Sequence, residues 1–343
     1  MFLNPSKILF VSCLILGTLI SISSNSWLGV WIGLEINLLS FIPLMTNHNN
    51  ILTTEASLKY FLIQAFASAT LLFSIIMSYL MSYTTFQFDT EISYSILIIS
   101  ALLLKMGAAP FHFWFPGTME GLNWWNAFIL MTWQKIGPLI LLSYVISTNT
   151  FIIAIIVTCT IIGSIGGLNQ TSLRKLMAYS SINHLGWMIA ALTMGNNLWI
   201  FYFLMYTFLT ASIVFLFNCF QIYHMNQNFL MLSHTPTIKF CLFTSLLSLG
   251  GLPPFLGFLP KWMVIQTMSE TMSIFVVTVM VITTLFTLFY YLRITFSAFL
   301  LSYSDIKWNS FPILNNNSLF KLMILASIST FGLSLSTLMF SLL

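Results

Sequence analysis

Residues 93–117 have the sequence SYSILIISALLLKMGAAPFHFWFPG, an apolar stretch long enough to cross a bilayer but interrupted by glycine and proline. A hydrocarbon core about 30 Å thick needs about 20 such residues in a helix. The segments Gly107-Ala-Ala-Pro110-Phe and Gly251-Leu-Pro253-Pro254-Phe share the pattern G-x-x-P-F and lie 144 residues apart. Proline lacks the N–H that a helix needs, and glycine loosens the same turn. We therefore expect two broken membrane helices at matching places in the chain.

Composition supports a membrane protein. Of 343 residues, 58% are hydrophobic and 5% are charged, whereas a soluble domain has about 25% charged residues. Asparagine-rich breaks divide the chain into apolar runs, which predict an all-α polytopic membrane protein with about 11 transmembrane helices. The expected spans are 7–24, 27–46, 56–83, 93–117, 122–146, 150–168, 174–195, 198–224, 237–268, 274–301 and 320–342.

The spacing of the two broken segments predicts an internal repeat. It places the first five expected spans over the next five, within a single transmembrane domain of residues 1–343. Because five is odd, the halves would have opposite orientations in the membrane, as in many transporters. We expect a first inverted repeat at 7–146, a second at 150–301, and an extra C-terminal helix at 320–342.

The charges in the loops predict an orientation. Basic residues favour the cytoplasmic or matrix side, and here they share the side of the N-terminus: Lys7, Lys59, Arg174, Lys175, Lys239, Lys307 and Lys321. The opposite side would hold Asp89, Glu91 and Glu270, without lysine or arginine. The N-terminus is therefore expected inside and the C-terminus outside.

Four charged residues are expected deep within the membrane: Glu35, Lys105, Lys135 and Lys261. Such a side chain costs roughly 3 kcal/mol or more at the bilayer centre, which makes it a candidate functional residue. Glu35 and Lys105 have similar expected depths, so we predict an ion pair. The alternative for these two residues is a buried pair that serves packing alone.

Lys135 and Lys261 have no spare acid at matching depth. A buried lysine without an acidic partner gives up its proton more easily than an exposed one, and groups of this kind joined by water could form a proton relay. The expected path leads from Lys105 to Lys135 and then to Lys261. The alternative for Lys261 is a helix end from which its side chain reaches the membrane surface.

Two histidines could support this relay. His112 directly follows the first break, where it could pass protons or simply hydrogen-bond to the carbonyl groups that the break leaves free. His184 lies among Ser180, Ser181 and Asn183, which together predict a polar patch at membrane depth.

The sequence contains no motif for a cofactor, a metal or a nucleic acid. Cys13, Cys159, Cys219 and Cys241 are scattered among apolar residues, without the C-x-x-C or Cys/His spacing of a metal or iron–sulfur site. Glycine-rich nucleotide-binding patterns are also missing. We expect the chain to bind no cofactor, metal or nucleic acid of its own.

The chain resembles the antiporter-like subunit family of mitochondrial NADH–ubiquinone oxidoreductase, respiratory complex I. The resemblance covers essentially the whole chain and rests on four segments: EINLLSFIP (35–43), KMGAAPFHFW (105–114), TWQK (132–135) and GGLPPFLGFLPKW (250–262). It implies a glutamate–lysine pair at Glu35 and Lys105, and relay lysines at Lys135 and Lys261. Full-length relatives have fourteen helices, of which animal mitochondrial forms lack the first three.

The resemblance also implies a setting. The chain would be a multi-pass protein of the mitochondrial inner membrane, with its N-terminus in the matrix and its C-terminus in the intermembrane space. Its partners would be lipids and other membrane-arm subunits, including neighbouring antiporter-like subunits. It would take part in proton translocation driven by NADH oxidation and ubiquinone reduction, without a redox centre of its own.

Two other classes of function remain open at this point. A free-standing cation/proton antiporter of the same superfamily would show its own ion dependence without partners. A purely structural subunit would pair all its buried charges internally, but the lysines expected in the membrane outnumber the acids. The short loops favour an energy source in a partner protein.

Overall fold

The computed structural model describes residues 5–47, 50–81, 88–146, 149–227, 236–271, 273–300 and 316–342. Lys307 of the predicted basic side and the expected span ends at 83 and 301 lie outside these ranges. The chain divides into two compact units, Met1–Ile155 and Ile156–Leu343, and α8 (Thr150–Gly167) crosses the boundary. Each unit is described by itself.

The described residues form α-helices joined by short connections. Seven helical segments of the described chain are long and apolar enough to cross a membrane, and shorter apolar helices end at Met106 and Gly250. Each expected span contains a helix. The chain is therefore an all-α polytopic membrane protein, as the composition predicted.

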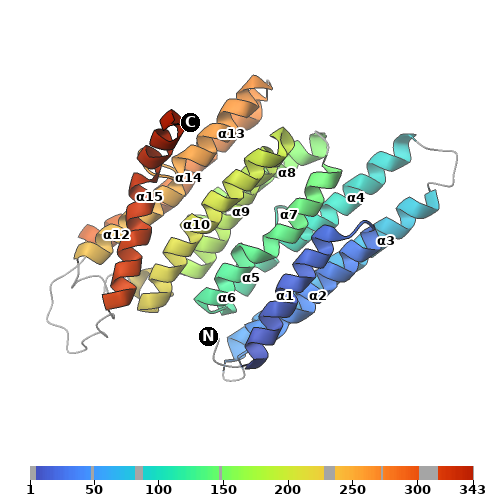
Figure 1. Ribbon diagram of the computed structural model, residues 1–343, viewed down its shortest axis with the longest axis horizontal. Helices are drawn as coiled ribbons and strands as arrows, with labels where there is room; N and C mark the ends of the chain where they lie inside the picture. Colours follow the sequence, from blue (N-terminus) through green and yellow to red (C-terminus); the bar gives the residue numbers. More distant parts are fainter. Residues whose placement is uncertain are drawn as a thin grey trace. The chain divides into compact units, whose positions relative to one another are not determined.

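The first unit contains seven helices within the described ranges, drawn in blue to green in Figure 1. They are α1 (Pro5–Ser23), α2 (Trp27–Met45), α3 (Ile51–Met81), α4 (Phe88–Met106), α5 (Trp114–Gly121), α6 (Trp124–Met131) and α7 (Trp133–Val145). Ser26 caps α2 by accepting a hydrogen bond from the Gly29 N–H at 3.3 Å, which satisfies one of the donors at the start of the helix.

Helices α1 and α2 touch almost backbone to backbone. A Cβ atom added to Gly33 would lie 2.5 Å from the Ser21 nitrogen, and one added to Gly17 would lie 2.8 Å from the Asn37 nitrogen. Small residues spaced in this way let membrane helices approach closely. The contact holds the buried face of α2 in a defined position.

The expected span 122–146 is divided into α6 and α7, a break that was not predicted. Thr132 lies between the two helices, and its hydroxyl donates to the Phe128 carbonyl at 2.7 Å. Pro138 lies one turn into α7 and has no N–H to donate to the Gln134 carbonyl. Both features locally weaken the helical hydrogen bonds near Lys135.

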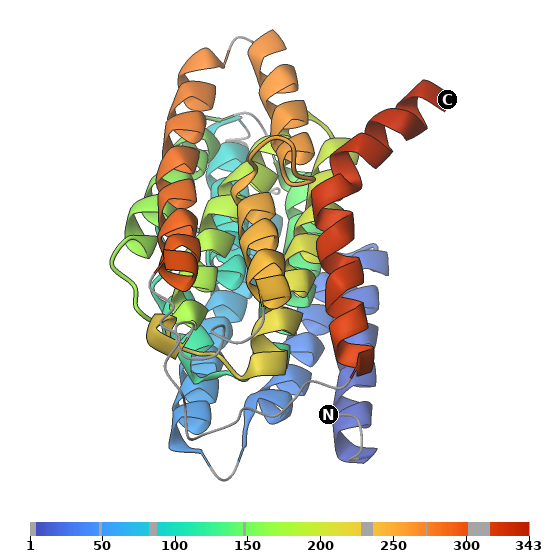
Figure 2. The same cartoon turned by 90° about the vertical axis from the view of Figure 1, so that its left-hand side faces the viewer.

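The second unit is built from the remaining helices. After α8 these are α9 (Leu173–Met194), α10 (Asn196–Phe220), α12 (Pro236–Gly250), α13 (Phe258–Glu270), α14 (Ile274–Leu300) and α15 (Asn316–Leu342). Figure 2 shows α15, in red, beside α12 and α10, and residues of these helices are in contact.

Helix α9 is the polar centre of this unit. From Leu176 to Leu192 nearly every side chain is buried, including Ser180, Ser181, Asn183 and His184. The helix was expected as span 174–195, but its composition is too polar for it to count among the apolar spans of the described chain. Burial within the protein explains how such a helix is tolerated at membrane depth.

The two predicted breaks have the same local geometry. Helices α4 and α12 end before Gly107 and Gly251, whose φ angles are +72° and +79°. In each break the N–H of the following residue donates to the carbonyl five residues earlier, at 3.0 Å in the first and 3.4 Å in the second. Ala109-Pro110 and Pro253-Pro254 are both cis. The inverted repeats over 7–146 and 150–301 stay a prediction.

Candidate functional site

The first break exposes carbonyl groups inside the first unit, and side chains satisfy them. The Lys105 carbonyl accepts a hydrogen bond from Gln64 Nε2 at 3.1 Å, and the Leu104 carbonyl accepts one from Trp114 Nε1 at 3.1 Å. The non-helical backbone is thus stabilised by α3 and α5. Lys105 lies on the last turn of α4 and is 7% exposed.

Lys105 lines a small polar cavity, called here the inner cavity. Its volume is about 10 Å³, close to the smallest that holds one water molecule. The lining residues are Leu34, Asn37, Leu38, Tyr60, Gln64, Lys105, Gln134 and Pro138. The lysine therefore faces polar groups contributed by α2, α3 and α7.

The amide groups around this cavity are connected to one another. Gln134 Nε2 donates to Asn37 Oδ1 at 3.0 Å, and the Tyr60 hydroxyl reaches Gln134 Oε1 at 3.5 Å. Sequence reasoning missed Asn37, Tyr60, Gln64 and Gln134. Each could have been noticed in the sequence as an amide or hydroxyl side chain within an apolar run. Their partners could not, because the contacts join residues as far as 97 positions apart.

Glu35 interacts electrostatically with Lys105 but does not touch it. The carboxylate is a source of the electrostatic field at the lysine, yet in this described part of the chain no nitrogen–oxygen contact within 4.0 Å joins the two groups. Leu34, Asn37 and Leu38 occupy the α2 face that lines the inner cavity, and Glu35 lies beside that face. The predicted direct ion pair is therefore wrong, and the coupling acts at longer range.

Lys135 is the most deeply buried of the candidate lysines, at 1% exposure on the first turn of α7. Its ammonium lies 5.5 Å from the centre of the Phe115 ring, a distance at which an aromatic face attracts a cation. Phe115 also packs against the first break, since a Cβ atom at Gly107 would lie 3.0 Å from the Phe115 Cβ. One aromatic side chain thus links the break to this second lysine.

His112 takes part in the local structure of the first break. Its Nδ1 lies 3.2 Å from the Pro110 carbonyl, and its ring lies 4.3 Å from that of Phe113. The contact matches the alternative in which His112 binds a carbonyl group of the break. A role in proton transfer stays a prediction.

Lys261 is held at the second break, within the second unit. It lies in the first turn of α13, 6% exposed, and its Nζ donates to the Gly250 carbonyl at 2.8 Å. A Cβ atom at Gly251 would lie 2.9 Å from the lysine Cδ. The lysine therefore points into the break, and the alternative in which it reaches the membrane surface is wrong.

His184 belongs to a buried polar cluster of this second unit. Its Nδ1 lies 2.9 Å from the Tyr202 hydroxyl, and its ring lies 5.1 Å from that of Tyr206. The predicted patch of Ser180, Ser181, Asn183 and His184 is buried as expected.

Four tyrosines around α9 were missed by sequence reasoning. Tyr202 and Tyr206 from α10 and Tyr290 and Tyr291 from α14 are all buried, and the Tyr291 hydroxyl lies near those of Ser180 and Tyr290. The sequence contained two signals within apolar spans: Tyr202 and Tyr206 have i, i+4 spacing, and Tyr290 and Tyr291 are adjacent. A phenol buried at this depth needs a polar neighbour. His184 of α9 supplies it for Tyr202, whereas the hydroxyls of Tyr290 and Tyr291 have no hydrogen-bond partner within the described ranges.

The sequence matches a known protein family over residues 24–287, described as NADH:quinone oxidoreductase/Mrp antiporter, TM. The chain belongs to this family. Family members similar to it include the NADH-ubiquinone oxidoreductase chain 2 proteins of two mosquitoes. The identity is 56% for Anopheles gambiae, covering 91% of this chain and 90% of the relative. It is 53% for Aedes aegypti, covering 98% of each chain.

Solved structures share the fold of this chain. A chain of respiratory complex I from Thermus thermophilus with bound aureothin has a TM-score of 0.84 at 24% identity, covering 96% of this chain and 78% of that chain. A chain of the Mrp complex from Dietzia sp. has a TM-score of 0.75 at 17% identity, covering 84% and 59%. At these identities the likeness concerns the fold alone.

Within the described ranges, no three or more His, Cys, Asp or Glu residues form a group that could hold a metal ion. The expectation that the chain binds no cofactor stays a prediction.

Proposed function

We propose that this family member is a core membrane subunit of respiratory complex I and takes part in proton translocation coupled to NADH oxidation and ubiquinone reduction. The observation that carries the proposal is 53% identity to NADH-ubiquinone oxidoreductase chain 2 of Aedes aegypti over 98% of both chains. The chain would belong to an NADH:ubiquinone reductase as a subunit, without holding a redox centre itself.

The proposed setting is the mitochondrial inner membrane. The N-terminus lies in the matrix and the C-terminus in the intermembrane space, an orientation supported by the loop charges of the sequence. The partners are lipids and other membrane-arm subunits, including neighbouring antiporter-like subunits. The apolar helices of the described chain support contact with lipid.

In the first unit, the proposed mechanism depends on the charge of Glu35. That charge acts on Lys105 without contact, so protonation or displacement of the carboxylate removes a favourable interaction with the lysine cation. The proton of the Lys105 ammonium can then pass to water, since the side chain lines the inner cavity. Gln134 lies on the same wall and is followed directly by Lys135.

In the second unit, Lys261 is the proposed proton carrier. Its ammonium has a carbonyl acceptor at Gly250 and a neighbouring aromatic face, since its Nζ lies 5.9 Å from the centre of the Trp187 ring. His184 and the hydroxyl group of Tyr202 support proton movement within the same unit. We propose that His112 has the lesser, structural role at the first break.

Native gel electrophoresis of mildly solubilised membranes tests the assignment to complex I. We expect the chain, identified by mass spectrometry, in a very large band that also stains for NADH dehydrogenase activity. Migration alone or as a small oligomer without that activity would contradict the proposal. A free-standing antiporter of the same superfamily would then be the leading alternative.

A further inference from the structure

Two amide side chains hold the divided helix α6–α7 to α2, one on each side of the break at Thr132. On α6, Asn126 Nδ2 donates to the Leu44 carbonyl at 2.7 Å. On α7, Gln134 Nε2 donates to Asn37 Oδ1 at 3.0 Å. Leu44 and Asn37 lie about two helical turns apart on α2. Helix α2 therefore spans the break and contacts both of its sides.

The two hydrogen bonds differ in what they do for α2. Leu44 belongs to the last turn of α2, where the carbonyl groups of a helix have no partner within the helix. Asn126 therefore satisfies a backbone group at the helix end. Asn37 lies in the middle of α2, and its bond with Gln134 joins two side chains. This second bond therefore holds α7 in position against α2 and satisfies no backbone group.

The backbone of α7 around Gln134 is weakened on both sides. The Lys135 N–H donates to the Thr132 carbonyl at 3.2 Å, which spans three residues where an α-helix spans four. Pro138 has no N–H to donate to the Gln134 carbonyl. The first turn of α7, which carries Lys135, is therefore held less firmly by its own backbone than a regular helical turn.

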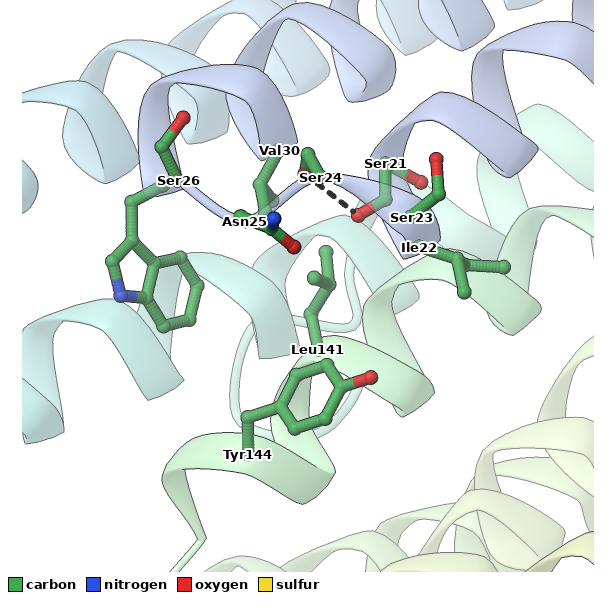
Figure 3. Close-up of a pocket in the computed structure, with 10 residues that line it drawn as sticks. Ser21, Ile22, Ser23, Ser24, Asn25, Ser26, Val30, Leu141 and Tyr144 are labelled. Carbon is green, nitrogen blue, oxygen red and sulfur yellow. Dashed lines mark hydrogen bonds between the residues drawn. The ribbon is translucent and has the colours of Figure 1, made fainter.

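Farther along α7, a cavity of about 350 Å³ lies between this helix and the turn that joins α1 and α2. Figure 3 shows Leu141 and Tyr144 of α7 on one side of the cavity, with the serines and Asn25 of the turn on the other. This part of α7 faces open space at the turn. The bond from Gln134 therefore holds α7 to α2 at the end of α7 that carries Lys135.

Gln134 also connects the surroundings of the two candidate lysines of this unit. It lines the inner cavity together with Lys105 and Asn37, and it directly precedes Lys135 in the chain. Asn37 lies two residues after Glu35 on the same helix. A displacement of α2 that moves the Glu35 carboxylate therefore also moves the hydrogen-bond partner of Gln134.

We infer that Gln134 is a positioning residue, and that its hydrogen bond with Asn37 holds Lys135 in place for proton transfer. The proton comes from Lys105, so the inference rests on the proposed proton roles of the two lysines. The Lys105 ammonium gives up its proton through water and becomes a neutral amine, and the Lys135 amine gains a proton and becomes an ammonium. The neutral amide of Gln134 neither binds nor releases the proton.

The test measures the ratio of protons pumped to NADH oxidised in sealed vesicles that contain the assembled complex. A loss of stability lowers the amount of complex but leaves this ratio unchanged. Gln134→Met keeps the length of the side chain and removes the amide. The matched control, Asn126→Leu, removes the other bond between this divided helix and α2. We expect Gln134→Met to lower the ratio at least about twofold and Asn126→Leu to leave it unchanged. Equal ratios would overturn the inference.

Exchange of the two side chains gives a second readout. Gln134→Asn shortens the side chain by a methylene group and should also lower the ratio. Asn37→Gln, added to that variant, restores the combined length of the two side chains, and we expect it to restore the ratio. An exchanged pair that pumps no better than Gln134→Asn would overturn the inference. This pair also carries the test if Gln134→Met does not assemble.

A third variant, Lys135→Met, separates the inference from the proposed function. Because Gln134 acts through Lys135, adding Gln134→Met to Lys135→Met should lower the ratio no further, and a further fall would overturn the inference. A normal ratio in Lys135→Met would contradict the proposed relay, and the inference would fall with it. A low ratio in Lys135→Met beside a normal ratio in Gln134→Met would overturn the inference alone and leave the relay standing.

Discussion

At the residue scale, the position of the Lys261 charge depends on Gly251, because the absence of a side chain there leaves room for the lysine. Its ammonium donates to the Gly250 carbonyl, and its aliphatic part occupies the space beside Gly251. We predict that Gly251→Ala destabilises the protein by about 1–2 kcal/mol, since φ is +79° at this residue, and displaces the lysine. Thermal inactivation of NADH:ubiquinone activity measures the loss of stability, and proton pumping measures the effect of displacing the lysine. Gly195→Ala is the control, because nothing lies within 4 Å of its Cβ position.

Glu35 allows a second test at the residue scale, because glutamine keeps its shape and removes its charge. Loss of a charge interaction of about 1.4 kcal/mol changes a proton equilibrium roughly tenfold. We therefore predict that Glu35→Gln lowers the pumping rate by roughly this factor while the complex still assembles. The exposed Glu55 on α3 supplies the control, Glu55→Gln. Equal pumping by the two variants would contradict the proposed action of Glu35 on Lys105.

At the element scale, the breaks show what local sequence can and cannot predict. The two G-x-x-P-F segments predicted breaks after Met106 and Gly250, because the effects of glycine and proline act within one turn. The break at Thr132 was missed because it depends on a threonine hydroxyl that binds the Phe128 carbonyl. Such a bond occurs in many uninterrupted helices.

The contacts of the polar residues around Lys105 were harder to predict than the breaks, for another reason. Glu35 and Lys105 were expected at similar depth, but depth does not determine the direction in which a helical side chain points. The Asn37–Gln134 contact joins residues 97 positions apart, and its formation depends on how α2 and α7 pack. Charged residues at membrane depth were therefore predictable one by one, whereas their neighbours were not.

The contact between α1 and α2 gives a prediction at the element scale. Gly33→Ala forces the two backbones apart, because the new Cβ atom would lie 2.5 Å from the Ser21 nitrogen. Overpacking of this kind costs about 1–3 kcal/mol, and we expect less assembled complex on native gels. Gly117→Ala is a matched control in the same unit, with nothing within 4 Å of its Cβ position. Equal assembly of both variants would contradict the proposed close contact.

At the scale of the whole molecule, the loop charges predict which ends of the helices face the matrix. A cysteine at the exposed residue Asn25 should react with an impermeant maleimide added to mitoplasts. A cysteine at the exposed residue His224 should react only after the inner membrane is permeabilised. The opposite pattern would contradict the matrix location of the N-terminus, since the basic residues would then lie outside.

We propose that a buried lysine of this subunit, Lys105, moves protons for the whole complex. Proton uptake per NADH oxidised, measured in sealed vesicles containing the assembled Lys105→Met complex, tests it most directly. The control is Lys59→Met, which removes an exposed lysine in the third turn of α3. We predict a complex that assembles but pumps at roughly a tenth of the control rate or less. Assembly with an unchanged proton-to-NADH ratio would contradict it.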